Sequence, residues 1–296
     1  MKYEARAGLR PAWRCPLADR SKPLPSDVWR HQAVQWERVG PPLRPSAPDT
    51  RCLERIVQAW VAEQGVPSVL VLGVTPEMAK LSWPEGTDLL AVDRSAEMIQ
   101  KVWPGYPGPG EGTLLADWME MSLPADSRDL VIGDGCFNVL SHPEQHQTLM
   151  RVAHETLRPS GRLAFRAFVR PEAPEQPADV YRAVMNGEIG NFHAFKLRLL
   201  MAVQPSSEAG VVTGDVWKSW LADGPRPEDL ASRLGWPLAQ ITTIEAYRDQ
   251  DTVLCFPTLA ELRGVAEERF EELGCEVPPY ELGERCPTLV LAPRET

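Results

Sequence analysis

The stretch Ser68-Val-Leu-Val-Leu-Gly73 is an apolar run of strand length that ends in a glycine. An apolar run without polar alternation is typical of a strand that is buried on both faces, as in a parallel sheet. Further runs of the same character follow it, at 88–93, 113–116, 129–132 and 162–169. Helical patterns over 95–102 and 141–157 separate several of these runs. Buried strands that alternate with helices predict an α/β fold with a doubly wound, mostly parallel sheet.

The segments on either side of these runs have a different character. Residues 1–48 are rich in proline and arginine and form an N-terminal arm with a helical candidate over 27–39. The α/β core extends over 49–170, and a mostly helical insertion follows it over 171–256. The last segment, 257–296, contains a helix to about Leu273 and two strand candidates, 275–282 and 288–293, that can pair as an antiparallel hairpin.

Composition excludes several classes of protein. The chain has 296 residues, 43% of them hydrophobic, and a formal net charge of −10, which disfavours a general nucleic-acid binder. No apolar run is long enough to span a membrane, and the N-terminus does not resemble a signal peptide. Six scattered cysteines without a CxxC pair favour neither a disulfide framework nor a metal site. We therefore expect a cytoplasmic protein without a metal.

Acidic residues follow two of the expected strands. In open α/β sheets the ligand lies beyond the carboxyl ends of the strands. Asp93 ends the second strand twenty residues after Gly73, where a carboxylate can accept hydrogen bonds from ribose hydroxyls; the alternative is a helix N-cap. Asp117 and Trp118 follow the third strand, where they can bind and cover an adenine base or serve as ordinary turn and core residues. The G-x-G-x-x-G fingerprint of nicotinamide enzymes is missing after Gly73.

Four segments in this order carry a family resemblance: VLVLG (69–73), AVDRSAEMI (91–99), LLADWMEMSLPADSRDLVIGDG (114–135) and HETLRPSGRLAF (154–165). Together they resemble the class I S-adenosylmethionine-dependent methyltransferases. The resemblance implies a Rossmann-like seven-stranded sheet with an antiparallel last strand. It also implies S-adenosyl-L-methionine as the cofactor, bound at the ends of strands one to four, and a helical substrate lid inserted after strand five.

The resemblance also implies a set of cofactor-binding residues at these four strand ends: Gly73, Val74, Thr75, Pro76, Asp93, Arg94, Ser95, Met98, Ala116, Asp117, Trp118, Gly133, Asp134 and Gly135. The chain departs from the common D-x-G-x-G-x-G pattern, because Val71, Thr75 and Glu77 replace the aspartate and the later glycines. The variant LGVTPE resembles a subgroup of uncharacterised methyltransferases.

Methyl transfer needs an acceptor site and, for an O or N nucleophile, a base. His193 and Asp134 are the candidate bases, although His193 can equally be a surface or core histidine. Arg44, in the rigid segment Pro41-Pro-Leu-Arg-Pro45, is a candidate for binding the methionine carboxylate or for a structural salt bridge. The candidate substrate residues lie in the arm and the lid: Trp29, Trp36, Tyr181, Asn191 and Phe192.

The main hypothesis is methyl transfer from S-adenosyl-L-methionine to an O or N atom of a small molecule, by a monomer or homodimer. A non-catalytic cofactor-binding or scaffold protein of the same fold is the first alternative. Transfer of the aminopropyl or carboxypropyl arm of the cofactor is another. Residues 227–241 read like the helix-turn-helix of a DNA-binding regulator, but the acidic residues around them argue against this.

Overall fold

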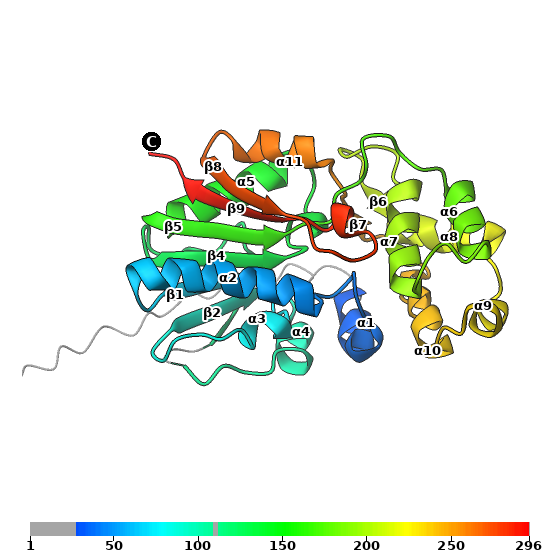
Figure 1. Cartoon of the computed structure of the whole chain (residues 1–296), viewed down its shortest axis with the longest axis horizontal. Coiled ribbons are helices and arrows are strands. Elements are labelled where there is room, and N and C mark those ends of the chain that lie inside the picture. The colour runs from blue at the N-terminus through cyan, green and yellow to red at the C-terminus, as the bar shows by residue number, and fades with distance from the viewer. Residues whose placement is uncertain (1–27, 109–111, 296) are drawn as a thin grey trace, which may run out of the picture.

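A computed structural model describes residues 28–108 and 112–295, and it contains a central seven-stranded sheet (Figure 1). The sheet consists of β1 (Ser68–Leu72), β2 (Asp88–Asp93), β3 (Thr113–Leu115), β4 (Arg128–Asp134), β5 (Leu157–Arg166), β8 (Phe270–Glu276) and β9 (Thr288–Pro293). Their order is β3-β2-β1-β4-β5-β9-β8. Strands β1 to β5 pair in parallel, whereas β9 is antiparallel to both β5 and β8. The predicted Rossmann-like fold with an antiparallel last strand is confirmed.

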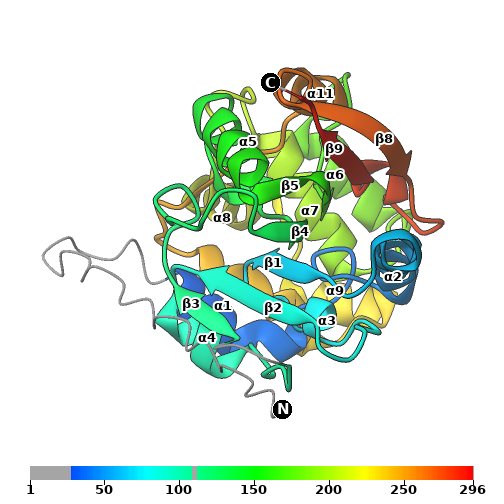
Figure 2. The same ribbon diagram turned by 90° about the vertical axis from the view of Figure 1, so that its left-hand side faces the viewer.

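Helices cover both faces of this sheet (Figure 2). The helices of the core are α2 (Ala47–Gln64), α3 (Pro76–Ala79), α4 (Ala96–Lys101), α5 (Glu144–Thr156) and α11 (Leu259–Ala266). Val69 and Val71 of β1 pack with residues of α2 and α4, and Leu70 and Leu72 pack with residues of α5 and α11. All four are essentially inaccessible to solvent. A strand whose two faces both pack on helices explains the unbroken apolar run 69–72.

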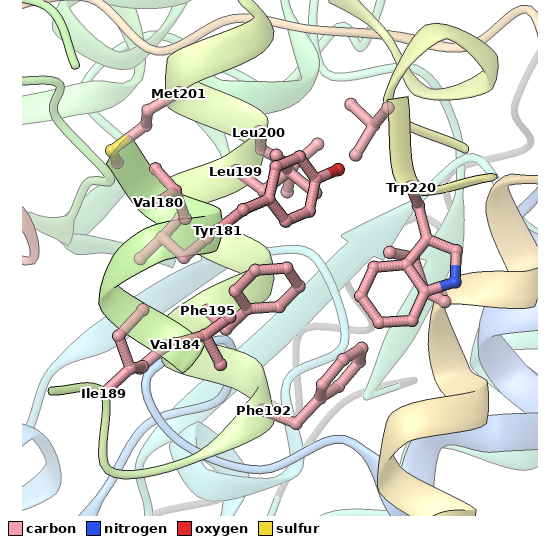
Figure 3. Close-up of a cluster of buried hydrophobic side chains, with 14 of the residues drawn as sticks. Val180, Tyr181, Val184, Ile189, Phe192, Phe195, Leu199, Leu200, Met201 and Trp220 are labelled. Atoms are coloured by element: carbon pink, nitrogen blue, oxygen red, sulfur yellow. The ribbon is translucent and has the colours of Figure 1, made fainter. Parts of the chain in front are cut away.

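The inserted segment forms a separate hydrophobic cluster beside the carboxyl ends of the strands (Figure 1). The helices and strands of this inserted segment, 171–256, which we call the lid, include α6 (Pro177–Met185), α7 (Phe192–Val203), β6 (Val211–Val212), α8 (Thr213–Asp223), α9 (Pro227–Leu234), α10 (Leu238–Ile241) and β7 (Val253–Leu254). Phe192 and Phe195 of α7 pack against Trp220 of α8, with ring centroids 6.0 and 5.6 Å apart (Figure 3). This buried aromatic cluster holds the lid helices together.

The remaining elements connect these two parts. They are α1 (Val28–Gln35) and the 3₁₀ helices η1 (Trp36–Arg38), η2 (Phe137–Val139), η3 (Thr242–Tyr247) and η4 (Gly283–Arg285). Helix α1 contacts both α4 of the core and η3 of the lid. Helix α1 therefore lies between the two halves of the molecule, and residues 1–27 of the N-terminal arm are outside the described range.

Two local expectations differ from the structure. The helix expected to end near Leu273 ends at Ala266, and the strand expected over 275–282 lies earlier, as β8 (Phe270–Glu276), where it pairs antiparallel with β9. The helix that resembles a DNA-recognition helix, α10, has only four residues. Since a recognition helix must be long enough to enter the major groove, a DNA-binding role for 227–241 has no structural support. Among the described helices, none has the length and apolar character needed to cross a bilayer.

Candidate functional site

A cavity lies at the carboxyl ends of β1 to β4, between the sheet and the lid. One side is lined by the residues that end these strands or directly follow them: Leu72, Gly73, Val74, Thr75, Asp93, Arg94, Met98, Ala116, Asp117, Trp118, Asp134, Gly135 and Cys136. The rest of the wall comes from α1, η1, η2, α7, α8, η3 and the segments near them: Trp29, Trp36, Val39, Leu43, Asn138, Val139, Leu140, Phe168, Lys196, Leu200, Thr213, Tyr247, Thr252, Leu254 and Phe256.

Gly73, Asp93 and Trp118 meet at one corner of this cavity. Gly73 has a φ of +95°, a conformation that favours glycine. A Cβ atom at Gly73 would lie 3.7 Å from Cζ2 of Trp118 and 3.9 Å from Oδ2 of Asp93. The indole N–H of Trp118 donates to the carbonyl of Val92 at 2.6 Å, which fixes the ring. The absence of a side chain at Gly73 therefore leaves open space between a carboxylate and an indole ring.

Asp93 combines burial with a partly free carboxylate. Its Oδ1 accepts a hydrogen bond from the backbone N–H of Ser95 at 2.8 Å, while its Oδ2 faces Gly73. The helix N-cap is Ser95, whose Oγ accepts from the N–H of Met98. Burial raises the pKa of Asp93 to about 6. Asp93 is thus ionised at neutral pH and can accept further hydrogen bonds inside the cavity.

Asp117 lies farther along the same wall, at the end of β3. Its Oδ1 accepts from the backbone N–H of Met119 at 2.9 Å, and its Oδ2 lies 3.9 Å from Nη1 of Arg94. Both Arg94 and Asp117 are partly exposed. The side chain therefore has remaining acceptor capacity toward the cavity.

The altered glycine turn forms the start of a very short helix. Thr75 is the N-cap of α3 and Pro76 is its first residue, and both are buried. The Glu77 carboxylate points to Arg44, whose Nε and Nη2 donate to Oε1 at 3.1 and 2.6 Å. Of these four residues, only Thr75 lines the cavity. Arg44 thus forms the structural salt bridge that was its alternative role.

Two other predicted residues also lie behind the cavity wall. Ser95 caps α4, as described above. Gly133 lies inside β4, where an added Cβ would come within 2.6 Å of Sγ of Cys136 and 3.4 Å of Cβ of Leu72. Gly133 is therefore needed for packing, whereas Asp134 and Gly135 line the cavity.

Asp134 belongs to a buried network that the sequence did not reveal. Nε of Arg166, at the end of β5, donates to Oδ1 of Asp134 at 2.6 Å. Nη1 of Arg166 lies 3.4 Å from Oδ2 of Asp49 and 3.2 Å from the hydroxyl of Tyr280, and Tyr280 donates to Oδ1 of Asp49 at 2.8 Å. Burial raises the pKa of the Asp134 carboxyl, against the opposing effect of the Arg166 guanidinium. One oxygen of the Asp134 carboxylate is thus bound to an arginine, and the role of Asp134 as a base stays a prediction.

His193 is buried in α7 but is not part of the cavity wall. Its ring lies against Gly40, with Cδ2 3.3 Å from the position of an added Cβ. Burial, and then the charge of Lys196, lower the pKa of His193 to about 4. The histidine is therefore neutral at pH 7, and it faces the N-terminal arm.

The candidate substrate residues fall into two groups. Trp29 and Trp36 line the cavity. Tyr181 and Phe192 lie in the interior of the lid, where the hydroxyl of Tyr181 is 3.0 Å from Oγ of Ser219 (Figure 3). Asn191 caps α7 by accepting from the N–H of Ala194 at 2.9 Å. The structure thus brings the two tryptophans, but not the three lid residues, to the site.

Lys196 is a cavity residue that no sequence-based expectation included. It lies on α7 and is 1% exposed, and its Nζ donates to Oγ1 of Thr243 at 3.1 Å. In the run Phe192-His-Ala-Phe-Lys-Leu-Arg-Leu-Leu200, apolar residues occupy nearly every face of the helix. A lysine inside such a run was the available signal, because charged residues are rarely found among apolar residues on all sides unless they are partly buried.

Residues 71–165 match the family model of the methyltransferase domain. Over these residues the chain is similar to a methyltransferase domain. The matched residues run from β1 to β5 and include Gly73, Asp93, Asp117 and Asp134, which all line the cavity. Within the described ranges 28–108 and 112–295, no three His, Cys, Asp or Glu side chains are placed to hold a metal ion.

Solved structures with similar folds include a protein of Rhodobacter sphaeroides that is provisionally named a zinc-dependent alcohol dehydrogenase. It is 14% identical, with a TM-score of 0.54 over 90% of this chain and 98% of that chain, and this likeness shows the fold alone. The N-methyltransferase NodS of Bradyrhizobium japonicum, in complex with S-adenosyl-L-homocysteine, is 12% identical, with a TM-score of 0.45 over 90% and 98% of the two chains. The CcbJ methyltransferase of Streptomyces caelestis is 15% identical, with a TM-score of 0.48 over 89% and 96%. No curated protein sequence matches the chain.

Proposed function

We propose that this chain transfers the methyl group of S-adenosyl-L-methionine to an oxygen or nitrogen atom of a small molecule. The observation that carries the proposal is the Asp93 carboxylate, which faces the open space beside Gly73 within the methyltransferase domain. This position is the point in an α/β sheet where a ribose carboxylate is needed. The unsubstituted Gly73 and the ring of Trp118 fit an adenosyl group beside that carboxylate.

Each residue of the strand-end wall has a distinct task in this proposal. Asp93 accepts hydrogen bonds from the two ribose hydroxyls, and Asp117 accepts from the adenine amino group. Gly135, with a φ of +61°, lets the chain pass close to the methionine part of the cofactor. The bound cofactor supplies an electrophilic methyl group on a sulfonium. The chain itself aligns the acceptor with that methyl group and excludes water by means of the lid.

Binding of S-adenosyl-L-methionine, measured by titration calorimetry, tests this function. We expect binding near pH 7.5 and a progressive loss of affinity as the pH falls through about 6. Burial raises the pKa of Asp93 to about 6, so the carboxyl becomes protonated and loses acceptor capacity in this range. No binding by the folded protein at pH 7.5 would refute the function. An affinity that is constant down to pH 5 would refute the role of the Asp93 charge.

We further propose the organisation that surrounds this reaction. The segment 171–256 serves as the substrate lid and 257–296 completes the core, while the described part of the arm 1–48, residues 28–48, closes the cavity from the side. A net charge of −10 supports a small-molecule substrate rather than nucleic acid. The free thiols of the described cysteines support a reducing, cytoplasmic location. We propose that the protein is a monomer or a homodimer.

A further inference from the structure

The amine of Lys196 is buried at the cavity without a countercharge. The side chain is 1% exposed, and among the described residues no carboxylate forms an ion pair with it. Burial alone lowers the pKa of Lys196 to about 7. A substantial fraction of this lysine is therefore a neutral amine at physiological pH, and such an amine can accept a proton.

Two contacts determine how the amine is oriented. The hydroxyl of Thr243 donates to the carbonyl of Gln240 at 2.6 Å, so toward Lys196 it can only accept a hydrogen bond. Nζ also lies 5.3 Å from the centre of the Tyr247 ring, within the range of a cation–π or N–H–π contact. Two N–H bonds are thus directed to Thr243 and Tyr247. The remaining position on nitrogen holds the lone pair of the neutral amine.

A second buried polar group on the lid side of the cavity has no hydrogen-bond partner. Thr213, the first residue of α8, is 1% exposed, and its hydroxyl oxygen has no hydrogen-bond partner. A buried hydroxyl without a partner costs free energy, which a ligand can recover by forming the bond. Apolar side chains dominate the wall of the cavity that contains these two groups, among them Leu140, Phe168, Leu200, Leu254 and Phe256.

We propose that Lys196 is the catalytic base of the methyl transfer, and that the acceptor is an apolar or aromatic small molecule with one weakly acidic hydroxyl group, as in a phenol. Thr213 provides a hydrogen bond to the same acceptor. This inference rests on the function proposed above. An acceptor that is already a carboxylate has no proton to give to the amine, and the apolar wall favours an aromatic body over a sugar. A phenol, with an ordinary pKa of about 10, is acidic enough to give its proton to this amine during the transfer, whereas an aliphatic alcohol is far less acidic.

The transfer is balanced in atoms and charge. The hydroxyl proton of the acceptor moves to the lone pair of Lys196 Nζ as the oxygen attacks the sulfonium methyl carbon. A C–O bond forms, the C–S bond breaks, and its electron pair stays on sulfur. The products are a methyl ether, S-adenosyl-L-homocysteine and an ammonium group on Lys196, which then releases its proton to water.

Binding of para-nitrophenol in the presence of S-adenosyl-L-homocysteine tests the inference without turnover, because the phenol and the phenolate differ in colour. In the wild type we expect the bound dye to ionise at a lower pH than the free dye, since its proton passes to Lys196. Lys196→Met should abolish this shift and weaken binding about 10-fold or more, because a charge-assisted hydrogen bond is lost. Thr213→Val should keep the shift but weaken binding. Lys218→Met is the matched control, because Lys218 is an exposed lysine of the lid helix α8.

Two results would contradict the inference. If the wild type does not bind the dye, or if Lys196→Met ionises it as the wild type does, the inference is wrong. Calorimetry with S-adenosyl-L-methionine on the same two proteins tests the proposed function separately, and we expect equal affinities. Because Lys196→Met replaces a buried, unpaired amine by an apolar side chain of similar length, we expect its melting temperature not to fall. A dye shift that is present in the wild type and absent from folded Lys196→Met therefore supports the inference.

Discussion

Replacement of Asp93 by alanine is expected to weaken the binding of S-adenosyl-L-methionine about 100-fold or more. Hydrogen bonds to a charged group contribute about 1.5–3 kcal/mol each, and the carboxylate has two ribose hydroxyls to bind. Titration calorimetry at pH 7.5 measures the change. Asp93→Asn should lie between the wild type and Asp93→Ala, because the amide retains one acceptor oxygen but no charge.

The matched control for Asp93→Ala is Asp88→Ala at the other end of the same strand. Asp88 begins β2, is partly exposed and pairs with Arg128 at 3.1 Å. Its removal changes the charge of β2 as Asp93→Ala does, but far from the cavity, and should leave the affinity within about twofold of the wild type. An equal loss of affinity in both variants would mean that net charge, and not the position of Asp93, controls binding.

Replacement of Arg166 by methionine is expected to lower the free energy of unfolding by about 3–5 kcal/mol, because removing one partner of a buried ion pair leaves uncompensated buried charge. Arg166 is 1% exposed and lies between the carboxylates of Asp134 and Asp49. Urea denaturation followed by circular dichroism measures the loss. Adding Asp134→Asn to this variant should restore part of the stability, since one of the two unpaired carboxylates is then neutral.

Arg151→Met is the control for Arg166→Met. Arg151 forms an exposed pair with Glu155 one turn along α5, and such pairs contribute little, so we expect a change within about 0.5 kcal/mol. If Arg166→Met cost no more than Arg151→Met, the buried network would not stabilise the end of β5.

The sheet was predictable because its strands are unbroken apolar runs that differ clearly from their surroundings. The expected second strand, 88–93, coincides with β2. The fifth strand was less predictable: it begins at Leu157, and its pairing with β4 shifts register between Arg128 and Leu130. The residues Pro159 and Gly161 suggest a turn at this point, whereas the structure accommodates them as an irregularity within β5.

The site was predictable where its residues end or follow strands of the sheet. It was not predictable where the site depends on contacts between residues far apart in the sequence. Asp93, Asp117 and Asp134 each end or follow a strand, so their common location follows from the topology. Arg166 contacts Asp49 and Tyr280, which are 117 and 114 positions away. In α7 the apolar residues cover nearly every face, so helical periodicity alone does not tell whether Phe192, His193 or Lys196 faces the cavity.

The position of Trp29, Trp36 and Trp118 on the cavity wall gives the protein a built-in optical reporter. Indole emission depends on the polarity and mobility of its surroundings, and two of these rings come from the arm while the third lies beside Gly73. A ligand in either half of the cavity therefore lies near a tryptophan and is expected to change its fluorescence emission. Compounds can be screened on the unlabelled protein before any of them is known to be methylated.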